Sequence, residues 1–188
     1  MSVAAWIALG VPVALLLWVA ASYNRFVQQR NLVTESWSNV DTELRRRYDL
    51  IPNLVETVKG YAAHERALLE QVTAARAAAV AATGPPSTQA PVENEVVAGV
   101  RALLAVAEGY PDLKASDHFL ELQRELANTE DRIQAARRFY NANVRDLNRR
   151  VQSFPSMLIA RWFGFSEADY FEIEEAIHRA PAPDITLS

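Results

Sequence analysis

The chain opens with a long apolar stretch. Residues 1–24 contain no charged side chain, and residues 3–21 are almost wholly apolar. A helix needs about 20 such residues to cross a bilayer, so the pattern predicts a membrane-spanning anchor over residues 1–22. Pro12 lies near the middle of this anchor, and we expect it to kink the helix. Membrane helices tolerate such prolines because neighbouring groups satisfy the freed carbonyl.

A cleavable signal peptide is the alternative interpretation of this stretch. Val19-Ala20-Ala21 would serve as a small-residue cleavage site. A signal peptide also has a basic segment before a shorter apolar run. The chain lacks the basic segment and its apolar run is too long, so we favour a retained anchor.

The residues that flank the anchor are those typical of a membrane interface. Trp6, Trp18 and Tyr23 lie toward its two ends, and amphipathic rings are enriched at the headgroup level. Arginines, beginning with Arg25 and Arg30, follow the anchor but do not precede it. Basic residues concentrate on the cytoplasmic side of membrane helices. We therefore expect the short N-terminus outside and the rest of the chain in the cytoplasm.

A helical pattern continues after the anchor. Between residues 23 and 51 the larger apolar residues recur at steps of three, four and seven, which marks one face of a helix. No Gly or Pro interrupts residues 13–51, so this first helix can continue straight out of the anchor. Its apolar face comprises Phe26, Val33, Trp37, Val40, Leu44 and Ile51.

Residues 45–54 predict a corner between two helices. The arginines at 45–47 suit the C-terminal end of one helix, and Asp49 suits the start of another. Pro52 would then lie in a first helical turn, where its missing N–H has no partner to lose. One long helix kinked at Pro52 is the alternative, because the apolar phase runs on through residues 51–61. We favour the corner.

The second helix would run to about Ala82 and become rich in alanine. The Gly, Pro, Ser and Thr content of residues 83–92 predicts a loop after it. A third helix follows, with apolar residues from Val96 to Ala107, and closes at residues 109–111.

A fourth helix is the clearest element of the sequence. It begins at an N-cap of Ser116 or Asp117 and extends for about 35 residues. Its apolar residues recur at steps of three and four, strictly in heptads up to Tyr140, as in a coiled coil. With Trp37 and Leu44 of the first helix, the predicted helix-packing surface comprises Phe119, Leu122, Leu126, Ile133, Tyr140 and Leu147.

A short aromatic segment, residues 153–165, follows the fourth helix. If the chain reverses three times before it, the segment returns to the bilayer, with Trp162 and Phe163 at the membrane interface. If Pro52 only kinks the chain, there are two reversals and the segment is distal. A third interpretation is that these residues simply cap the core of the helical bundle.

The fold class that follows is all-α. We expect an N-terminal transmembrane helix followed by an antiparallel up-and-down four-helix bundle of long helices. The expected divisions are an anchor at 1–22, a helical bundle domain at 23–165 and a C-terminal tail at 166–188.

Composition excludes several kinds of chemistry. The chain has no cysteine, which removes thiol catalysis and cysteine-ligated metals. Its three histidines are far apart in sequence, so no histidine metal motif is present. The net charge is −4 with both signs interspersed, which argues against nucleic-acid binding. We expect no cofactor, no metal and no small-molecule substrate.

An enzyme is the least favoured hypothesis. His64 and Glu65 are sequence neighbours, so their side chains would point to different sides of a helix. Carboxylates on amphipathic helices are usually solvated, and a hydrolase would have to use them as acid or base. The carboxylates considered are Asp41, Glu43, Asp49 and Glu56.

Several long runs of the sequence resemble the LemA family. The run RRRYDLIPNLVETVKGYAAHE covers residues 45–65 and GYPDLKASDHFLELQRELANTEDRI covers 109–133. RRFYNANV (137–144) and FPSMLIARWFGF (154–165) follow in the same order, after an N-terminal span with Tyr23-Asn24 and Arg30-Asn31. The resemblance implies long antiparallel helices, an outward-facing N-terminus and a bacterial envelope setting, and it brings no catalytic motif. The tail from Ser166 onward departs from the pattern.

These patterns predict a non-catalytic scaffold or adaptor at the bacterial inner membrane. A tether confines copies to two dimensions and raises their effective concentration, so we expect a homo-oligomer. Membrane lipids and an envelope membrane protein are the other expected partners. The alternative is a membrane-remodelling or lipid-binding protein, in which Arg25, Arg30 and the arginines at 45–47 contact anionic headgroups while residues 154–165 insert.

Overall fold

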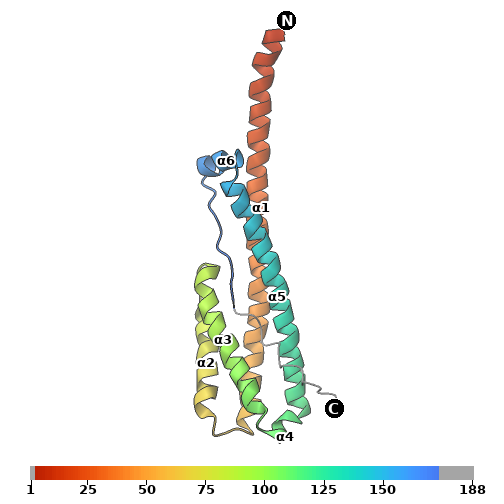
Figure 1. The fold of residues 1–188 in the computed structure, drawn as a ribbon, viewed down its shortest axis with the longest axis vertical. Helices are drawn as coiled ribbons and strands as arrows, with labels where there is room; N and C mark the ends of the chain where they lie inside the picture. Colours follow the sequence, from red (N-terminus) through yellow and green to blue (C-terminus); the bar gives the residue numbers. More distant parts are fainter. Residues whose placement is uncertain (1–2, 174–188) are drawn as a thin grey trace, which may run out of the picture. The chain divides into compact units, whose positions relative to one another are not determined.

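The computed structural model describes residues 3–173, with side chains from residue 9 onward. All regular structure in these residues is helical, and no strand occurs among them, so the all-α prediction is confirmed. Figure 1 shows the elements, which are α1 (Val3–Lys59), α2 (Arg66–Ala81), α3 (Pro86–Ala107), α4 (Pro111–Lys114), α5 (Asp117–Gln152) and α6 (Ser156–Phe163).

The described chain forms two compact units, and each combines segments that are distant in sequence. The anchor unit comprises residues 3–39 and 138–170, and the core unit comprises residues 40–137 and 171–173. Both α1 and α5 therefore contribute to both units. The predicted division at residues 22 and 165 stays a prediction.

In the anchor unit, α1 and α5 run antiparallel. Trp37 packs on Tyr140 with ring centroids 5.3 Å apart, and Gln29 donates a hydrogen bond to the backbone oxygen of Asn143 at 3.2 Å. The residue number falls along α1 as it rises along α5, which defines the direction. Apolar residues of both helices are buried between them, namely Phe26, Val33, Tyr140, Val144 and Leu147.

The chain after α6 runs back along α5 in the anchor unit, and side chains of α5 form hydrogen bonds with its backbone. The amide of Asn148 donates to the oxygen of Ala168 at 2.9 Å and accepts from its N–H at 2.8 Å. The Tyr140 hydroxyl donates to the oxygen of Asp169 at 2.7 Å. This segment has no regular structure of its own, so these two side chains supply hydrogen-bond partners for its backbone. Sequence patterns alone did not predict this role.

The core unit packs α2 and α3 side by side (Figure 1) against residues of α1 and α5. At Gly99 of α3 an added Cβ would lie 3.0 Å from Cγ2 of Val72. This distance is shorter than a normal van der Waals contact, so glycine permits the close approach of the two helices. Other fully buried residues of the unit are Val40, Ile51, Leu54, Val58, Val100, Leu103, Leu113, Ile133 and Phe171.

The predicted corner at Pro52 is wrong, because α1 continues through it to Lys59. The first turn instead lies at residues 60–65. Pro52 is exposed, and it leaves the carbonyl of Tyr48 without the N–H that a helix would supply four residues later. The Nε of Arg76, on α2, donates to that carbonyl at 2.6 Å. A tertiary contact therefore replaces the bond that Pro52 removes.

The predicted loop at 83–92 is also too long. Helix α3 begins at Pro86, with Pro85 as its N-cap, and Pro91 lies inside it. Proline suits the first helical position because its N–H would be unpaired there in any case. The composition that predicted a loop thus includes the start of a helix. The predicted end of the third helix and the start of the fourth at Asp117 are confirmed.

The contact between Arg76 and Tyr48 can be tested with a double-mutant cycle. We expect Arg76→Ala to lower the free energy of unfolding by about 1.5–3 kcal/mol, the net value of a hydrogen bond with a charged partner. In a Pro52→Ala background the same change should cost clearly less, because an alanine at position 52 supplies a backbone N–H to the Tyr48 carbonyl. Denaturation of the detergent-solubilised chain would measure both values. Equal costs in the two backgrounds would contradict the assignment.

Candidate functional site

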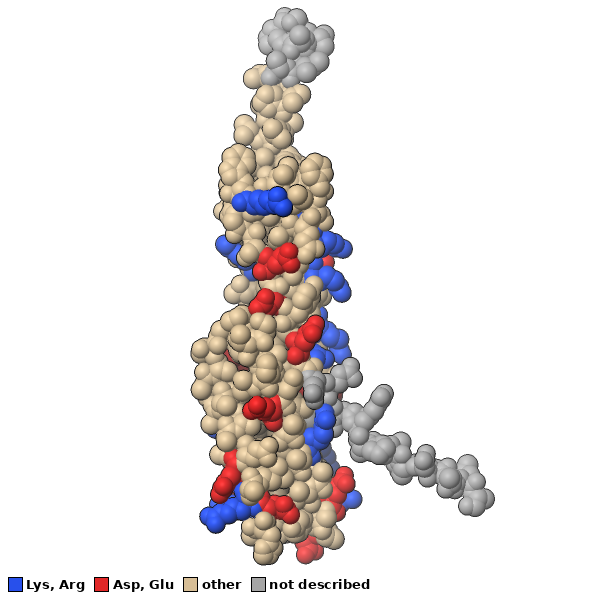
Figure 2. All heavy atoms as spheres, turned by 60° about the vertical axis from the view of Figure 1, so that its left-hand side comes forward, with Lys and Arg blue, Asp and Glu red and all other residues tan. Residues whose placement is uncertain are grey.

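The apolar segment of α1 is the first feature with functional meaning. Among the described residues, one helix is long and apolar enough to cross a membrane, and it is α1. Only 6% of its most apolar window is buried, whereas the core helix of a soluble protein is mostly buried. In Figure 2 the described N-terminal part of α1 shows no charged side chain. Its exposed residues include Leu9, Val11, Val13, Leu15, Leu16 and Leu17.

A cluster of rings joins α6 to α1 directly after the apolar segment. The ring of Tyr23 lies 5.0 Å from that of Phe163 and 5.7 Å from that of Phe165. Phe26 stacks on Phe165 at 4.8 Å, and the guanidinium of Arg30 lies 5.7 Å from the centre of the same ring. Such ring pairs and cation–π contacts each contribute about 0.5–1.5 kcal/mol. We call these five residues the aromatic collar.

The contact of α6 with Tyr23 places residues 153–165 beside the end of the apolar segment, as expected if the chain reverses three times. The first of these reversals lies at residues 60–65 and not at Pro52. Ile159 and Ala160 of α6 are buried, whereas Trp162 of the same helix is 78% exposed.

The structure brings some predicted interface residues together. Tyr23, Arg30 and Phe163 meet in the aromatic collar, and Trp162 stacks on Phe163 with centroids 5.8 Å apart. Arg25 and Trp18 are exposed and lie on α1 outside the collar. Trp6 lies in α1, but its side chain is outside the described residues. The interfacial role of all these residues stays a prediction.

The predicted helix-packing residues pack within the chain itself. Trp37 is half-buried against Tyr140. The other seven are buried, namely Leu44, Phe119, Leu122, Leu126, Ile133, Tyr140 and Leu147. These positions therefore stabilise the fold, and their use between copies stays a prediction.

The core unit contains a network of buried charges. Arg47 of α1 lies between Glu93 of α3 and Glu130 of α5, and each of the three side chains is 1% exposed. One guanidinium nitrogen contacts Glu93, and the other donates to Glu130 at 3.1 Å. The hydroxyl of Tyr48 donates to the second oxygen of Glu93. The planar fork of arginine suits two carboxylates, which a lysine could not bind in the same way.

The network combines one guanidinium group, two carboxyl groups and one phenol. Burial, and the charge of Glu93 beside it, raise the pKa of Tyr48 well above its ordinary value, so the phenol remains a hydrogen-bond donor. Within the described residues, Nε of Arg47 and Oε1 of Glu130 have no hydrogen-bond partner. Removing one member of such a network leaves an uncompensated buried charge. At 1% exposure these side chains are almost completely removed from water.

The expectation that all three arginines at 45–47 contact headgroups is wrong for Arg47. The sequence did hold a signal for its burial. Arg47 lies three residues after buried Leu44, Glu93 three before buried Val96, and Glu130 three before buried Ile133. Each charge thus falls on an apolar stripe. Three charges of complementary sign on three such stripes indicate a buried network.

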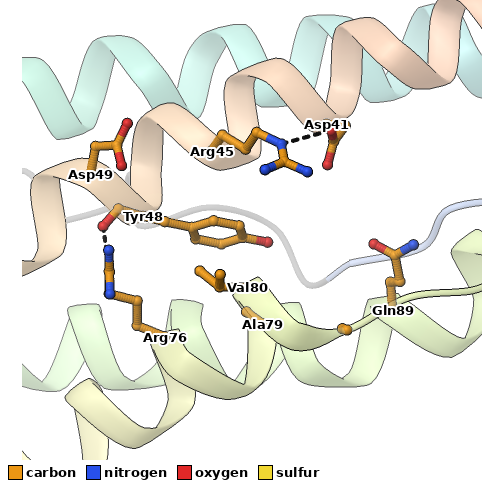
Figure 3. A pocket seen from close by; sticks show the side chains of 9 residues that line it. Asp41, Arg45, Tyr48, Asp49, Arg76, Ala79, Val80 and Gln89 are labelled. Carbon is orange, nitrogen blue, oxygen red and sulfur yellow. Dashed lines mark hydrogen bonds and ion pairs between the residues drawn. The ribbon is translucent and has the colours of Figure 1, made fainter.

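A polar groove lies between α1 and α2 (Figure 3), next to the start of α3. Asp41 forms an ion pair with Arg45 at 2.9 Å, which raises the pKa of Arg45 through the hydrogen bond and the charge. Arg76 is engaged with the Tyr48 backbone. Both cations of the groove therefore have partners. The groove is lined by Asp41, Arg45, Tyr48, Asp49, Arg76, Ala79, Val80, Ala82 and Gln89.

The carboxylates considered for hydrolysis do not converge on one site. Asp41 and Asp49 share the groove, but Glu43 pairs with Arg46 and Arg132, and Glu56 pairs with Lys59. His64-Glu65 lies in the turn before α2. In the described part of the chain, no three His, Cys, Asp or Glu side chains are grouped to bind a metal.

The comparisons with known proteins give the family. The sequence model of the LemA family matches residues 36–186. The chain belongs to the LemA family. It is similar to magnetosome protein MamQ of Magnetospirillum gryphiswaldense, with 25% identity covering 93% of this chain and 71% of that protein. MamQ 1 of Paramagnetospirillum magneticum is 26% identical (87% and 70% covered), and protein LemA of Metamycoplasma hominis is 23% identical (81% and 69%).

The buried network gives a prediction about stability. Arg47→Met should cost about 3–5 kcal/mol of unfolding free energy, because two buried carboxylates lose their cation. Arg47→Lys should fall between this variant and the parent chain. Arg45→Met, which removes a cation from the exposed pair with Asp41, is the matched control and should leave the melting temperature nearly unchanged. Similar losses for Arg47→Met and Arg45→Met would contradict the network's role.

The bond between Tyr140 and Asp169 predicts a loss of stability at alkaline pH. Burial and the charge of Asp169 raise the pKa of Tyr140 to about 12, against about 10 when unfolded. The contribution is complete below pH 10 and is lost as pH rises toward 12, since the unfolded phenol ionises first. We expect Tyr140→Phe to be less stable than the parent at pH 9, and to lose less stability between pH 9 and 11. Tyr61→Phe, at an exposed position, should change neither value.

Proposed function

We propose that the chain is a non-catalytic, membrane-anchored scaffold or adaptor at the bacterial inner membrane. The observation that carries this proposal is that α1 is one helix from its exposed apolar segment to Lys59 in the core unit. A membrane helix joined to a domain by a flexible linker would hold the domain near the membrane without being part of its fold. Here the anchor is part of the same helix that supplies Arg47 to the buried network, so the anchor and the fold share one element.

The comparisons support this proposal. The names of these three relatives state no reaction, and two of the three are called magnetosome proteins. We further propose that the core unit is an antiparallel up-and-down four-helix bundle and that it lies in the cytoplasm. Membrane confinement raises the effective concentration of copies, which favours a self-associated state.

The orientation can be tested with single cysteines, because the chain has none of its own. We expect a cysteine at Ser2 to react with a membrane-impermeant maleimide in intact spheroplasts. A cysteine at Thr83, in the exposed turn between α2 and α3, should react only after permeabilisation. The opposite labelling pattern would overturn the cytoplasmic placement, and labelling of both sites in intact spheroplasts would argue against a single span.

Self-association and partner binding need a separate experiment. In-cell crosslinking followed by mass spectrometry should give crosslinks between copies, recognised with a mixture of isotopically labelled and unlabelled chains. It should also give crosslinks to envelope membrane proteins. A strict monomer at high concentration in mild detergent, together with no crosslinked partner in cells, would contradict the scaffold proposal.

A further inference from the structure

One face of α6 is apolar and largely exposed. Leu158 and Trp162 are four residues apart and therefore lie on the same face of the helix, where they are 50% and 78% exposed. Phe154, in the turn that leads into α6, is also a large apolar side chain and is 77% exposed. Three large, exposed apolar side chains in and next to one short helix indicate a surface that another apolar phase covers.

This face lies beside the end of the apolar segment of α1. Tyr23 comes two residues after the last residue of the apolar stretch 3–21, and its ring contacts Phe163 at 5.0 Å. The stacking of Phe26 on Phe165 fixes the next residues of the chain to the same part of α1. The end of α6 is therefore at the depth where an anchor over residues 1–22 would leave the hydrocarbon region.

The charge around α6 matches a lipid surface. Residues 3–34 and 153–165 contain no acidic residue. Arg25, Arg30 and Arg161 are all exposed in this region. Basic residues near a membrane surface are attracted to anionic headgroups, and aromatic residues such as Trp162 are enriched at that level. A water-exposed surface or a basic protein partner would not require this combination.

We propose that α6 is an interfacial helix on the membrane that α1 crosses. Phe154, Leu158 and Trp162 enter the boundary between headgroups and acyl chains, and Arg25 and Arg161 contact the headgroup phosphates. The proposal rests on the proposed anchor, and it adds a second membrane contact more than 130 residues later in the chain. The bilayer is thereby the partner of the collar region, and the amphipathic form of α6 is what such a helix requires.

The test uses the full-length chain, spin-labelled at single introduced cysteines and reconstituted in vesicles of phosphatidylcholine and phosphatidylglycerol. Oxygen concentrates in lipid and a nickel chelate in water, so the ratio of the two accessibilities reports depth. We expect this ratio to be several-fold higher for Leu158→Cys and Trp162→Cys than for Glu167→Cys, an exposed polar position just after the collar. Leu15→Cys reports the anchor itself.

The outcomes separate this proposal from the proposed anchor. A lipid-like ratio at 15 with a water-like ratio at 158 and 162 would overturn the interfacial helix and leave the anchor in place. A water-like ratio at 15 would contradict the anchor. Labels at 158 and 162 that neither reagent reaches would show a protein cover, such as a second copy, and would also overturn the proposal. Equal depth with and without phosphatidylglycerol would overturn the role of the arginines.

Discussion

The buried pairing of Arg47 with Glu93 and Glu130 is the interaction on which the core unit depends. It joins α1, α3 and α5 at one point, and each side chain is almost completely removed from water. Two helices that pack only through apolar stripes can shift by one turn at a moderate cost in free energy, since one leucine replaces another in the contact. Helices joined by a buried ion pair cannot shift in this way, because a shifted register would leave a buried charge without its partner. The network therefore selects one alignment of the three helices.

The same region of α1 accommodates a proline within a helix of 57 residues. A proline in a helix interior removes a hydrogen bond and disturbs the preceding turn, at a cost of about 3 kcal/mol. Pro52 is exposed to solvent here, and Arg76 supplies the donor that the Tyr48 carbonyl lacks. Tyr48 in turn donates to Glu93. Tyr48 therefore takes part in both the hydrogen bond with Arg76 of α2 and the buried charge network. The packing of α2 and the register of the helices thus depend on each other.

Spacing and helix-ending residues predicted several elements correctly. These are the α5 helix, the apolar helix at the N-terminus and the end of α3 at Ala107. The prediction was wrong at Pro52, where the local signal for a corner was outweighed by Arg76, which is 24 residues away. Local signals could not reveal that bond. The charges at Arg47, Glu93 and Glu130 were visible as breaks in apolar stripes, but pairing them required the fold.

The segment after α6 shows why an apparently featureless tail can still be structural. Asn148 falls between apolar positions of α5 and, like the buried charges, interrupts a stripe. Its amide supplies one donor and one acceptor, which are the two groups that the backbone of Ala168 requires. The hydroxyl of Tyr140 satisfies the carbonyl of Asp169. Polar residues on an apolar stripe thus indicate a backbone segment that must be bound there, and this pair fixes the chain that leaves the collar.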